Sequence, residues 1–241
     1  MLLLANSLID GFVKSNGIGR GIVWVQLLCS VVMFAVIFGK WRELGALKAA
    51  TRRFLSDFAA CNAVLEYYIT RRPLRTQGIE GIYNVTCTRL LKILTPDARG
   101  LLVRNEANGV GTAALTSREI DLVRGSCEHA LDETAGGVEY GMGLIATVVA
   151  VAPMLGLLGT VWGVLDAFYE MGSAGSANLA TIAPSISSAL VTTVVGLLIA
   201  FPGIIACNVL NAMVRSITSE MEGFVDELMG RVACELQGRG V

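Results

Sequence analysis

Charge is scarce in this sequence. Only 16% of its 241 residues are Asp, Glu, Lys or Arg, against about 25% in ordinary soluble domains, and 54% are hydrophobic. This balance excludes a soluble domain of usual composition and indicates a chain immersed in lipid. The net charge of −1 and the lack of a basic patch give no indication of nucleic-acid binding.

The residues of common active sites and metal sites are also scarce. Histidine occurs once, as His129, so a histidine-based metal or catalytic site would lack partner ligands. The six cysteines lie far apart and form no CxxC pair, and we expect them to be reduced and structural. No phosphate-binding loop, nucleophile elbow or paired-carboxylate motif occurs. We therefore expect no enzymatic activity, no metal and no cofactor.

Three stretches without charge are long enough to cross a hydrocarbon core, which takes roughly 20 apolar residues. They are residues 22–38, residues 140–165 and part of residues 171–214. Trp24 and Trp41 suit the membrane boundaries of the first stretch. The third stretch is longer than one crossing, so it must include interfacial helix or a strong tilt.

Basic residues predict the orientation of these spans. Residues 39–137 contain 14 of the 19 Lys and Arg, so the positive-inside rule makes this segment cytoplasmic. Asp166 and Glu170, with no basic residue nearby, place the link after the second span outside. We predict an external N-terminus without a cleaved signal peptide, and an internal C-terminus.

The predicted organisation follows from these spans. The transmembrane helices are expected at 21–39, 138–166 and 181–211. A periplasmic segment at 1–20, a cytoplasmic helical region at 40–137, a periplasmic link at 167–180 and a cytoplasmic C-terminal helix at 212–241 complete the chain.

Helical periodicity continues outside the spans. Apolar residues have helical spacing over residues 42–69, and shorter helices are expected at 82–94 and within 100–107. A capping box at Thr116 to Glu119 predicts a long helix that runs into the second span, with Gly136 and Gly137 as a weak point. A heptad seam extends the third span: Leu210, Val214, Ile217, Met221, Phe224 and Leu228. The predicted fold class is an all-α membrane protein with three transmembrane helices and long cytoplasmic helical extensions.

Small residues line one side of the second span. Ala152, Gly156, Gly159 and Gly163 lie within about 40° to 60° of one another on a helix. Small residues let membrane helices approach closely, so we interpret this ridge as a packing surface. Pro153 beside it is tolerated because neighbouring groups can take up the carbonyl that a proline frees.

Hydroxyl side chains line one side of the third span, where Pro184 is also assigned to helix packing. Thr181, Ser185, Ser188 and Thr192 step by four, three and four residues and so share a stripe on a helix. A stripe of hydroxyls should not face lipid. Two interpretations fit it equally: hydrogen bonding between helices, or the wall of a polar cavity that admits ions or a polar partner helix.

Two motifs in these spans resemble the ExbB/TolQ branch of the MotA/TolQ/ExbB proton channel family. Residues 156–163, Gly-Leu-Leu-Gly-Thr-Val-Trp-Gly, are similar to the family's GLFGTVWG signature. Residues 183–196 with Ala200-Phe201-Pro202 are similar to its APGIAEALxATAxG…AxP segment. The three spans and the large insertion after the first agree with this branch, whereas MotA usually has four spans.

The resemblance implies a ring of five subunits in the bacterial inner membrane, enclosing the single transmembrane helices of a dimeric ExbD- or TolR-like partner. In that family the partner's membrane Asp takes up and releases protons, and the flow drives work on the envelope or outer-membrane transport. A TonB- or TolA-like protein is a further expected partner. The resemblance carries the ion pathway onto Thr160 and Thr193, whereas the stripe selects Thr192, and Ser185 and Ser188 complete the predicted pathway.

One position departs from the family pattern. Ser188 stands where the family has glutamate, so residues 171–214 contain no acid and the partner would have to carry the proton. The hydroxyls would then host the partner's carboxylate through hydrogen bonds. A non-conducting scaffold for a membrane partner remains the alternative. A channel without a partner is disfavoured because no charged ring lines the spans.

Overall fold

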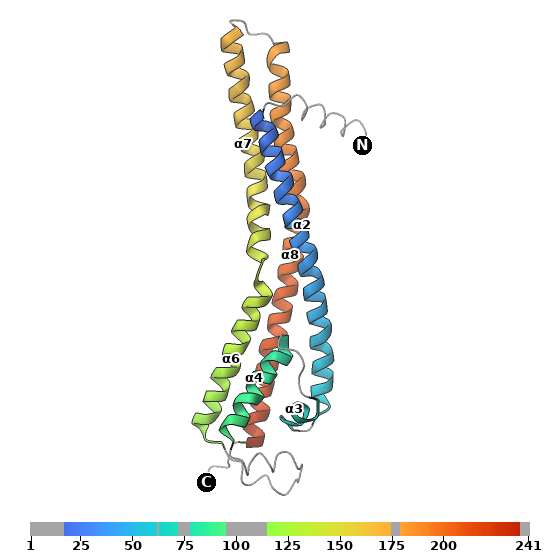
Figure 1. Cartoon of the computed structure of the whole chain (residues 1–241), viewed down its shortest axis with the longest axis vertical. Coiled ribbons are helices and arrows are strands. Elements are labelled where there is room, and N and C mark those ends of the chain that lie inside the picture. The colour runs from blue at the N-terminus through green and yellow to red at the C-terminus, as the bar shows by residue number, and fades with distance from the viewer. Residues whose placement is uncertain (1–16, 62, 72–77, 95–114, 175–178, 237–241) are drawn as a thin grey trace. The chain divides into compact units, whose positions relative to one another are not determined.

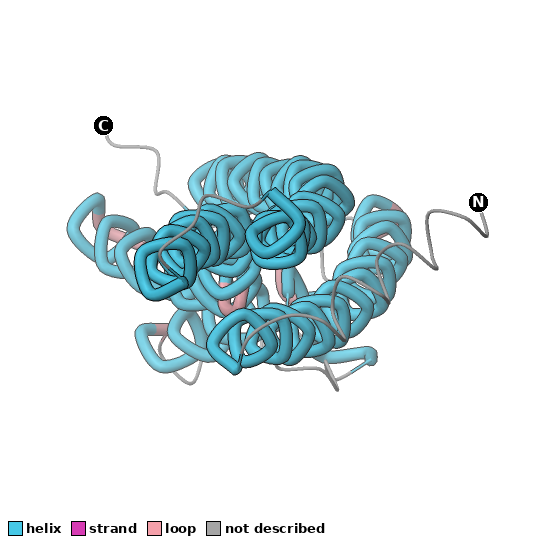
Figure 2. Tube along the Cα trace, turned by 90° about the horizontal axis from the view of Figure 1, so that it is seen from above, coloured by secondary structure: helices cyan, strands magenta, loops and turns pink. Residues whose placement is uncertain are grey.

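Every element in the described part of the chain is an α-helix. The computed structural model describes residues 17–61, 63–71, 78–94, 115–174 and 179–236 (Figure 1). Figure 2 shows its helices in cyan: α2 (Gly17–Ala59), α3 (Glu66–Arg71), α4 (Gly78–Ile93), α6 (Ser117–Glu139), α7 (Met142–Ala174) and α8 (Leu179–Leu236). Three helical segments are long and apolar enough to cross a membrane, which confirms the predicted fold class. The helix predicted within 100–107 lies outside the described residues.

The chain divides into two compact units, each of which is described by itself. The span unit comprises Met1–Trp41 and Gly141–Asn211. The charged unit comprises Arg42–Tyr140 and Ala212–Val241. Helices α2 and α8 are each divided between the two units, with one segment in the span unit and the other in the charged unit.

The span unit exposes large apolar side chains. Its α7 and the first half of α8 run side by side (Figure 1). The outward-facing residues include Trp24, Leu28, Val31, Phe38, Met154, Leu157, Val161, Leu165, Phe168, Leu197, Leu198 and Phe201. Such exposure is unfavourable in water at about 25 cal/mol per Å² but has no such cost in lipid. The pattern is that of a helix group with a narrow buried seam and a lipid-compatible exterior.

The junction between α6 and α7 differs from the prediction. Thr116 begins α6 with the predicted capping box, in which its backbone N–H donates to the Glu119 carboxylate at 2.8 Å. Gly136 and Gly137, however, lie inside α6. The helix ends at Glu139, two residues after Gly137, and Gly141 adopts the left-handed conformation with φ +87°. The break therefore occurs at the glycine whose backbone leaves the helical region.

The core of the charged unit is an aromatic cluster. The cluster consists of Phe54, Phe58, Tyr67, Tyr83 and Phe224, with ring centroids 5.1 to 6.5 Å apart. The Tyr83 hydroxyl donates to the Val64 carbonyl at 2.6 Å, and burial raises the pKa of Tyr83 above its usual range. The heptad-seam residues of this unit, from Val214 to Leu228, are all buried. Segments from α2, α3, α4 and α8 thus share one core.

The single helix predicted over residues 42–69 is wrong at its end. Helix α2 stops at Ala59, and α3 starts only at Glu66. The backbone N–H of Val64 donates to the Glu235 carboxylate at 3.0 Å, and the Arg231 guanidinium donates to the Cys61 carbonyl at 3.4 Å. Side chains near the end of α8 thus satisfy backbone groups in the turn, which lets the helix stop there.

All six cysteines are free thiols. Burial raises the pKa of the Cys87 thiol to about 12 and also raises that of Cys127, so both are poor nucleophiles.

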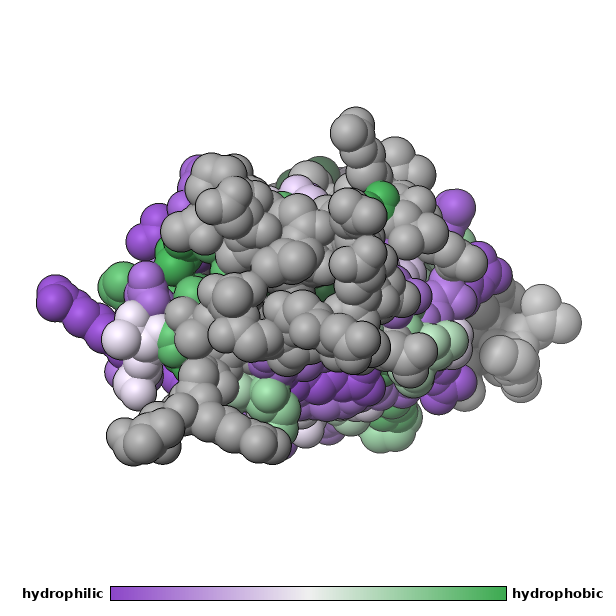
Figure 3. Space-filling model, turned by 90° about the horizontal axis from the view of Figure 1, so that it is seen from below, coloured by the Kyte–Doolittle hydropathy of each residue, from purple (hydrophilic) through white to green (hydrophobic). Residues whose placement is uncertain are grey.

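Viewed from below, the described surface carries mainly hydrophilic side chains with smaller hydrophobic patches among them (Figure 3).

Candidate functional site

The glycines of the small-residue ridge face α8 of the same chain. A Cβ at Gly156 would lie 2.8 Å from the Thr193 Cα, and one at Gly159 would lie 2.6 Å from the Thr192 Cβ. At Gly163 it would lie 2.5 Å from the Ala189 Cβ. All three distances are shorter than 3.0 Å, and Cβ atoms in proteins essentially never lie that close to another heavy atom. The ridge therefore allows α7 and α8 to approach more closely than any larger residue would permit.

Two adjacent threonines of α8 converge on one carbonyl of this ridge. The Thr192 hydroxyl lies 3.1 Å and the Thr193 hydroxyl 2.9 Å from the Gly156 carbonyl oxygen. Thr192 is 1% exposed, whereas Thr193 is half-buried. Thr192 also lies 2.7 Å from the Ala189 carbonyl oxygen within its own helix. Of the two threonines, only Thr193 leaves a substantial part of its side chain uncovered by this chain.

The other predicted pathway hydroxyls bond to carbonyls of their own helices or to an acid. Thr160 is half-buried and donates to Leu157 at 2.7 Å, and buried Ser188 donates to Ser185 at 2.9 Å. The side chain of Thr181 lies outside the described residues. Since each hydroxyl has one hydrogen and two lone pairs, these bonds occupy the donors and leave acceptor capacity.

Sequence reasoning missed a carboxylate that meets the stripe. The Ser185 hydroxyl, 7% exposed, donates to the Glu170 carboxylate of α7 at 3.0 Å. Residues 171–214 indeed contain no acid, but α7 supplies one from the residue just before that stretch. The sequence did contain a signal for this contact, because Glu170 is the last acidic residue before α8.

Sequence reasoning also missed Gln26 of α2. Its side chain is completely buried, and its amide N–H groups donate to Ala152 O at 3.1 Å and Thr192 O at 3.3 Å. Gly196 leaves room for this amide, because a Cβ there would lie 2.9 Å from the Gln26 nitrogen. The amide thus ties α2 to both helices of the seam. A glutamine inside an otherwise apolar span was the available signal.

The interface between α7 and α8, called the seam from here on, contains the hydroxyls described above, the Gln26 amide and the Glu170 carboxylate. Pro153 and Pro184 lie inside α7 and α8 without ending either helix. Among the described residues, no group of three or more His, Cys, Asp or Glu side chains could hold a metal ion. Chemically, the hydroxyl and carbonyl oxygens between α7 and α8 can accept hydrogen bonds and order a carboxyl group.

Comparison with known proteins gives one family and several relatives. The model of the MotA/TolQ/ExbB proton channel family matches residues 102–223. The chain is 29% identical to the Tol-Pal system protein TolQ of Haemophilus influenzae over 228 residues, which are 91% of this chain and 90% of that protein. It is 37% identical to the biopolymer transport protein ExbB of Neisseria gonorrhoeae over 216 residues, 88% of this chain and 90% of that protein. With the three apolar helical segments, these matches support a multi-pass inner-membrane protein.

Proposed function

Because this chain belongs to the MotA/TolQ/ExbB proton channel family, we propose that it is the ring-forming inner-membrane subunit of a proton-driven motor complex. Five copies enclose the transmembrane helices of an ExbD- or TolR-like partner. A TonB- or TolA-like protein passes the resulting force to the cell envelope or to outer-membrane transport.

The observation that carries the proposal is the hydrogen bonding of the hydroxyls between α7 and α8. The hydrogens of Thr160, Ser188, Thr192 and Thr193 have carbonyl acceptors within this chain, so the oxygens keep free lone pairs. Half-buried Thr160 and Thr193 are the members that a partner helix can reach. A neutral carboxyl of the partner would donate its O–H to these oxygens, which favours the protonated acid in low dielectric.

This role differs from the one expected from the sequence. There the hydroxyls donate hydrogen bonds to the partner's ionised carboxylate, whereas here they accept a hydrogen bond from its neutral form. A hydroxyl that donated to the ionised acid would first have to leave its carbonyl, whereas one that accepts from the neutral acid keeps that bond. Loss of the oxygens should therefore weaken proton uptake by the partner. Glu170, held by Ser185, stands as this chain's own proton-exchanging group at the end of the stripe.

Glutamine at position 170 tests this assignment. Glu170→Gln keeps an oxygen that accepts from Ser185 but removes the exchangeable acid, so proton flux should fall. Asp166→Asn is the matched control, because Asp166 lies one turn earlier on the same helix and is also half-buried. We expect the Glu170 change to lower flux in reconstituted vesicles more than the Asp166 change. Equal fluxes in the two variants would remove Glu170 from the pathway.

The complex itself is tested by native mass spectrometry. The chain, co-expressed with an ExbD- or TolR-like single-span protein, should give a mass of five copies plus two of the partner. The family resemblance supplies both numbers. A stable monomer, or a ring that does not retain the partner, would contradict the proposal.

The orientation proposed from the basic residues is tested by thiol labelling. The background replaces the three cysteines that are not buried, Cys29, Cys61 and Cys234, with alanine. Gly172→Cys, at an exposed position with no neighbouring atom within 4 Å of its Cβ, should react with an impermeant reagent from outside. Gly109→Cys should react only after the membrane is opened. The reverse pattern would invert the topology.

A scaffold that holds the partner without conducting is the second candidate. It is favoured by the serine at position 188 and by the internal bonding of the seam hydroxyls. It predicts normal assembly in every hydroxyl variant and no proton flux that depends on them.

A further inference from the structure

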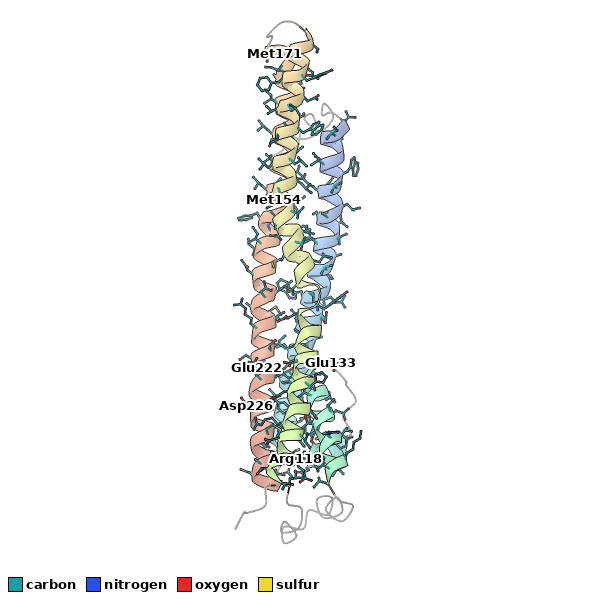
Figure 4. The ribbon with its side chains drawn as sticks, turned by 90° about the vertical axis from the view of Figure 1, so that its left-hand side faces the viewer. Arg118, Glu133, Met154, Met171, Glu222 and Asp226 are labelled. Atoms are coloured by element: carbon teal, nitrogen blue, oxygen red, sulfur yellow. The ribbon has the colours of Figure 1, made fainter. Side chains whose placement is uncertain are left out.

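One buried amide lies where the three helices of the span unit meet. The side chain of Gln26, from α2, is completely buried, and its Nε2 donates to the Ala152 carbonyl of α7 and the Thr192 carbonyl of α8. Met154, which Figure 4 labels two residues further along α7, is 68% exposed, whereas Ala152 is buried. Because two residues turn an α-helix by about 200°, the amide lies on the inner side of α7.

The backbone leaves a space for this amide. Gly156 of α7 and Gly196 of α8 lie beside it, and an added Cβ would lie 3.5 Å from the Gln26 Nε2 at Gly156 and 2.9 Å from it at Gly196. A methyl group at position 196 would therefore crowd the amide. Two glycines on different helices thus allow one side chain of α2 to reach the backbones of both.

The orientation of the amide follows from its two partners. Both are carbonyl oxygens, which only the NH₂ end can serve, so Oε1 is the end that is left over. In the described part of the chain, this buried oxygen has no hydrogen-bond partner, which costs free energy. The two carbonyls also lie inside continuous helices, where an N–H four residues further on already donates to each. The amide therefore contributes little net stability.

The same two hydrogen bonds hold both ends of the Thr193 contact. The Thr192 carbonyl belongs to the peptide group that leads into Thr193, and the Ala152 carbonyl lies one helical turn before Gly156. The Gly156 carbonyl in turn accepts from the Thr193 hydroxyl at 2.9 Å. Gln26 thus fixes the donor of this bond from one peptide group away and its acceptor from one turn away.

We propose that Gln26 is a positioning residue for the proton pathway, which sets how the Thr193 hydroxyl meets the partner. This inference rests on the proposed function, in which Thr160 and Thr193 accept from the partner's neutral carboxyl. Thr160 donates to Leu157 within its own helix, so its placement does not depend on the amide. Loss of the amide shifts α8 against α7 and moves Thr193 without moving Thr160.

Proton flux in vesicles that contain the partner tests this role through a double-mutant cycle. Gln26→Met keeps an unbranched side chain but removes both donors, and should lower flux about fivefold. In a Thr193→Val background the same change should lower flux by less than about twofold, because the oxygen that Gln26 positions is gone. In a Thr160→Val background the full loss should remain. Leu27→Met, at the exposed neighbouring position of α2, is the matched control and should conduct as the parent does.

Assembly and stability separate positioning from a purely structural role. Gln26→Met should retain the ring and the partner in native mass spectrometry. Its midpoint of thermal unfolding should stay close to that of the parent, because neither carbonyl loses its helical donor. Gln26→Leu repeats these measurements if the methionine variant does not assemble.

The positioning role is overturned if both variants lose the ring or the partner, or if Gln26→Met conducts as the parent does. It is also overturned if Gln26→Met lowers flux equally in the Thr193→Val and Thr160→Val backgrounds, as a general loosening of the helices would. In these cases the proposed function stands as long as Thr160→Val and Thr193→Val lower flux by themselves. Unchanged flux in both threonine variants would overturn the proposed function and this inference together.

Discussion

Replacing Gly159 with leucine is expected to separate α7 from α8 and to abolish the assembled ring. A Cβ at this position already lies 2.6 Å from the Thr192 Cβ, and three further carbons have no space. Overpacking of this kind typically costs about 1 to 3 kcal/mol, and here the neighbour is a buried side chain on a packed helix. Native mass spectrometry should show monomers, and thermal unfolding should begin at lower temperature.

The control for this change is Gly143→Leu in the same helix. Gly143 is exposed, and an added Cβ meets no atom within 4 Å. This variant should retain its midpoint of unfolding. The ridge acts within the chain, so the ring depends on it indirectly, through the spacing of α7 and α8. A Gly159→Leu protein with an unchanged midpoint and an intact ring would contradict this account.

Removing the accessible hydroxyls of the seam is expected to have the second large effect. Thr160→Val and Thr193→Val keep the side-chain shape but remove an oxygen that accepts from the partner's neutral carboxyl. If each bond contributes about 1.4 kcal/mol, each change lowers partner-dependent proton flux about tenfold, and the double change about a hundredfold. Flux into vesicles, followed with a pH-sensitive dye, measures the effect.

Serine substitutions and Thr192 supply the controls. Thr160→Ser and Thr193→Ser keep the oxygen and should conduct almost normally. Thr192 is covered by α7, so Thr192→Val should affect packing more than flux. A Thr192→Val loss that exceeds the Thr193→Val loss would place the pathway on the predicted stripe, and Thr192 would then replace Thr193 as the host.

Features that depend on composition and helical periodicity could be predicted from the sequence. The apolar runs give three spans, and the spacing of the heptad seam gives the buried face of α8. The glycines of residues 156–163 lie on one side of any helix, and they do pack against α8. These features follow from local rules, since each is fixed by residues a few positions apart.

Features that depend on distant partners could not be predicted. The end of α2 is set by Glu235 and Arg231, about 170 positions along the chain, and periodicity carries no information about them. Gln26 bonds to α7 and α8 in the same way. The sequence also did not show that the helix breaks at Gly141 and continues through Gly136 and Gly137, because glycine permits a left-handed backbone without requiring it.

The most direct test of the central claim is proton flux in vesicles that contain this chain with and without its single-span partner. The account predicts flux only with the partner present, a marked decrease in the Thr160→Val/Thr193→Val variant, and complete loss when the partner's membrane Asp is replaced with Asn. Flux from this chain alone would show that it conducts without a partner. A complex that assembles but conducts equally with and without the seam hydroxyls would contradict the proposed pathway.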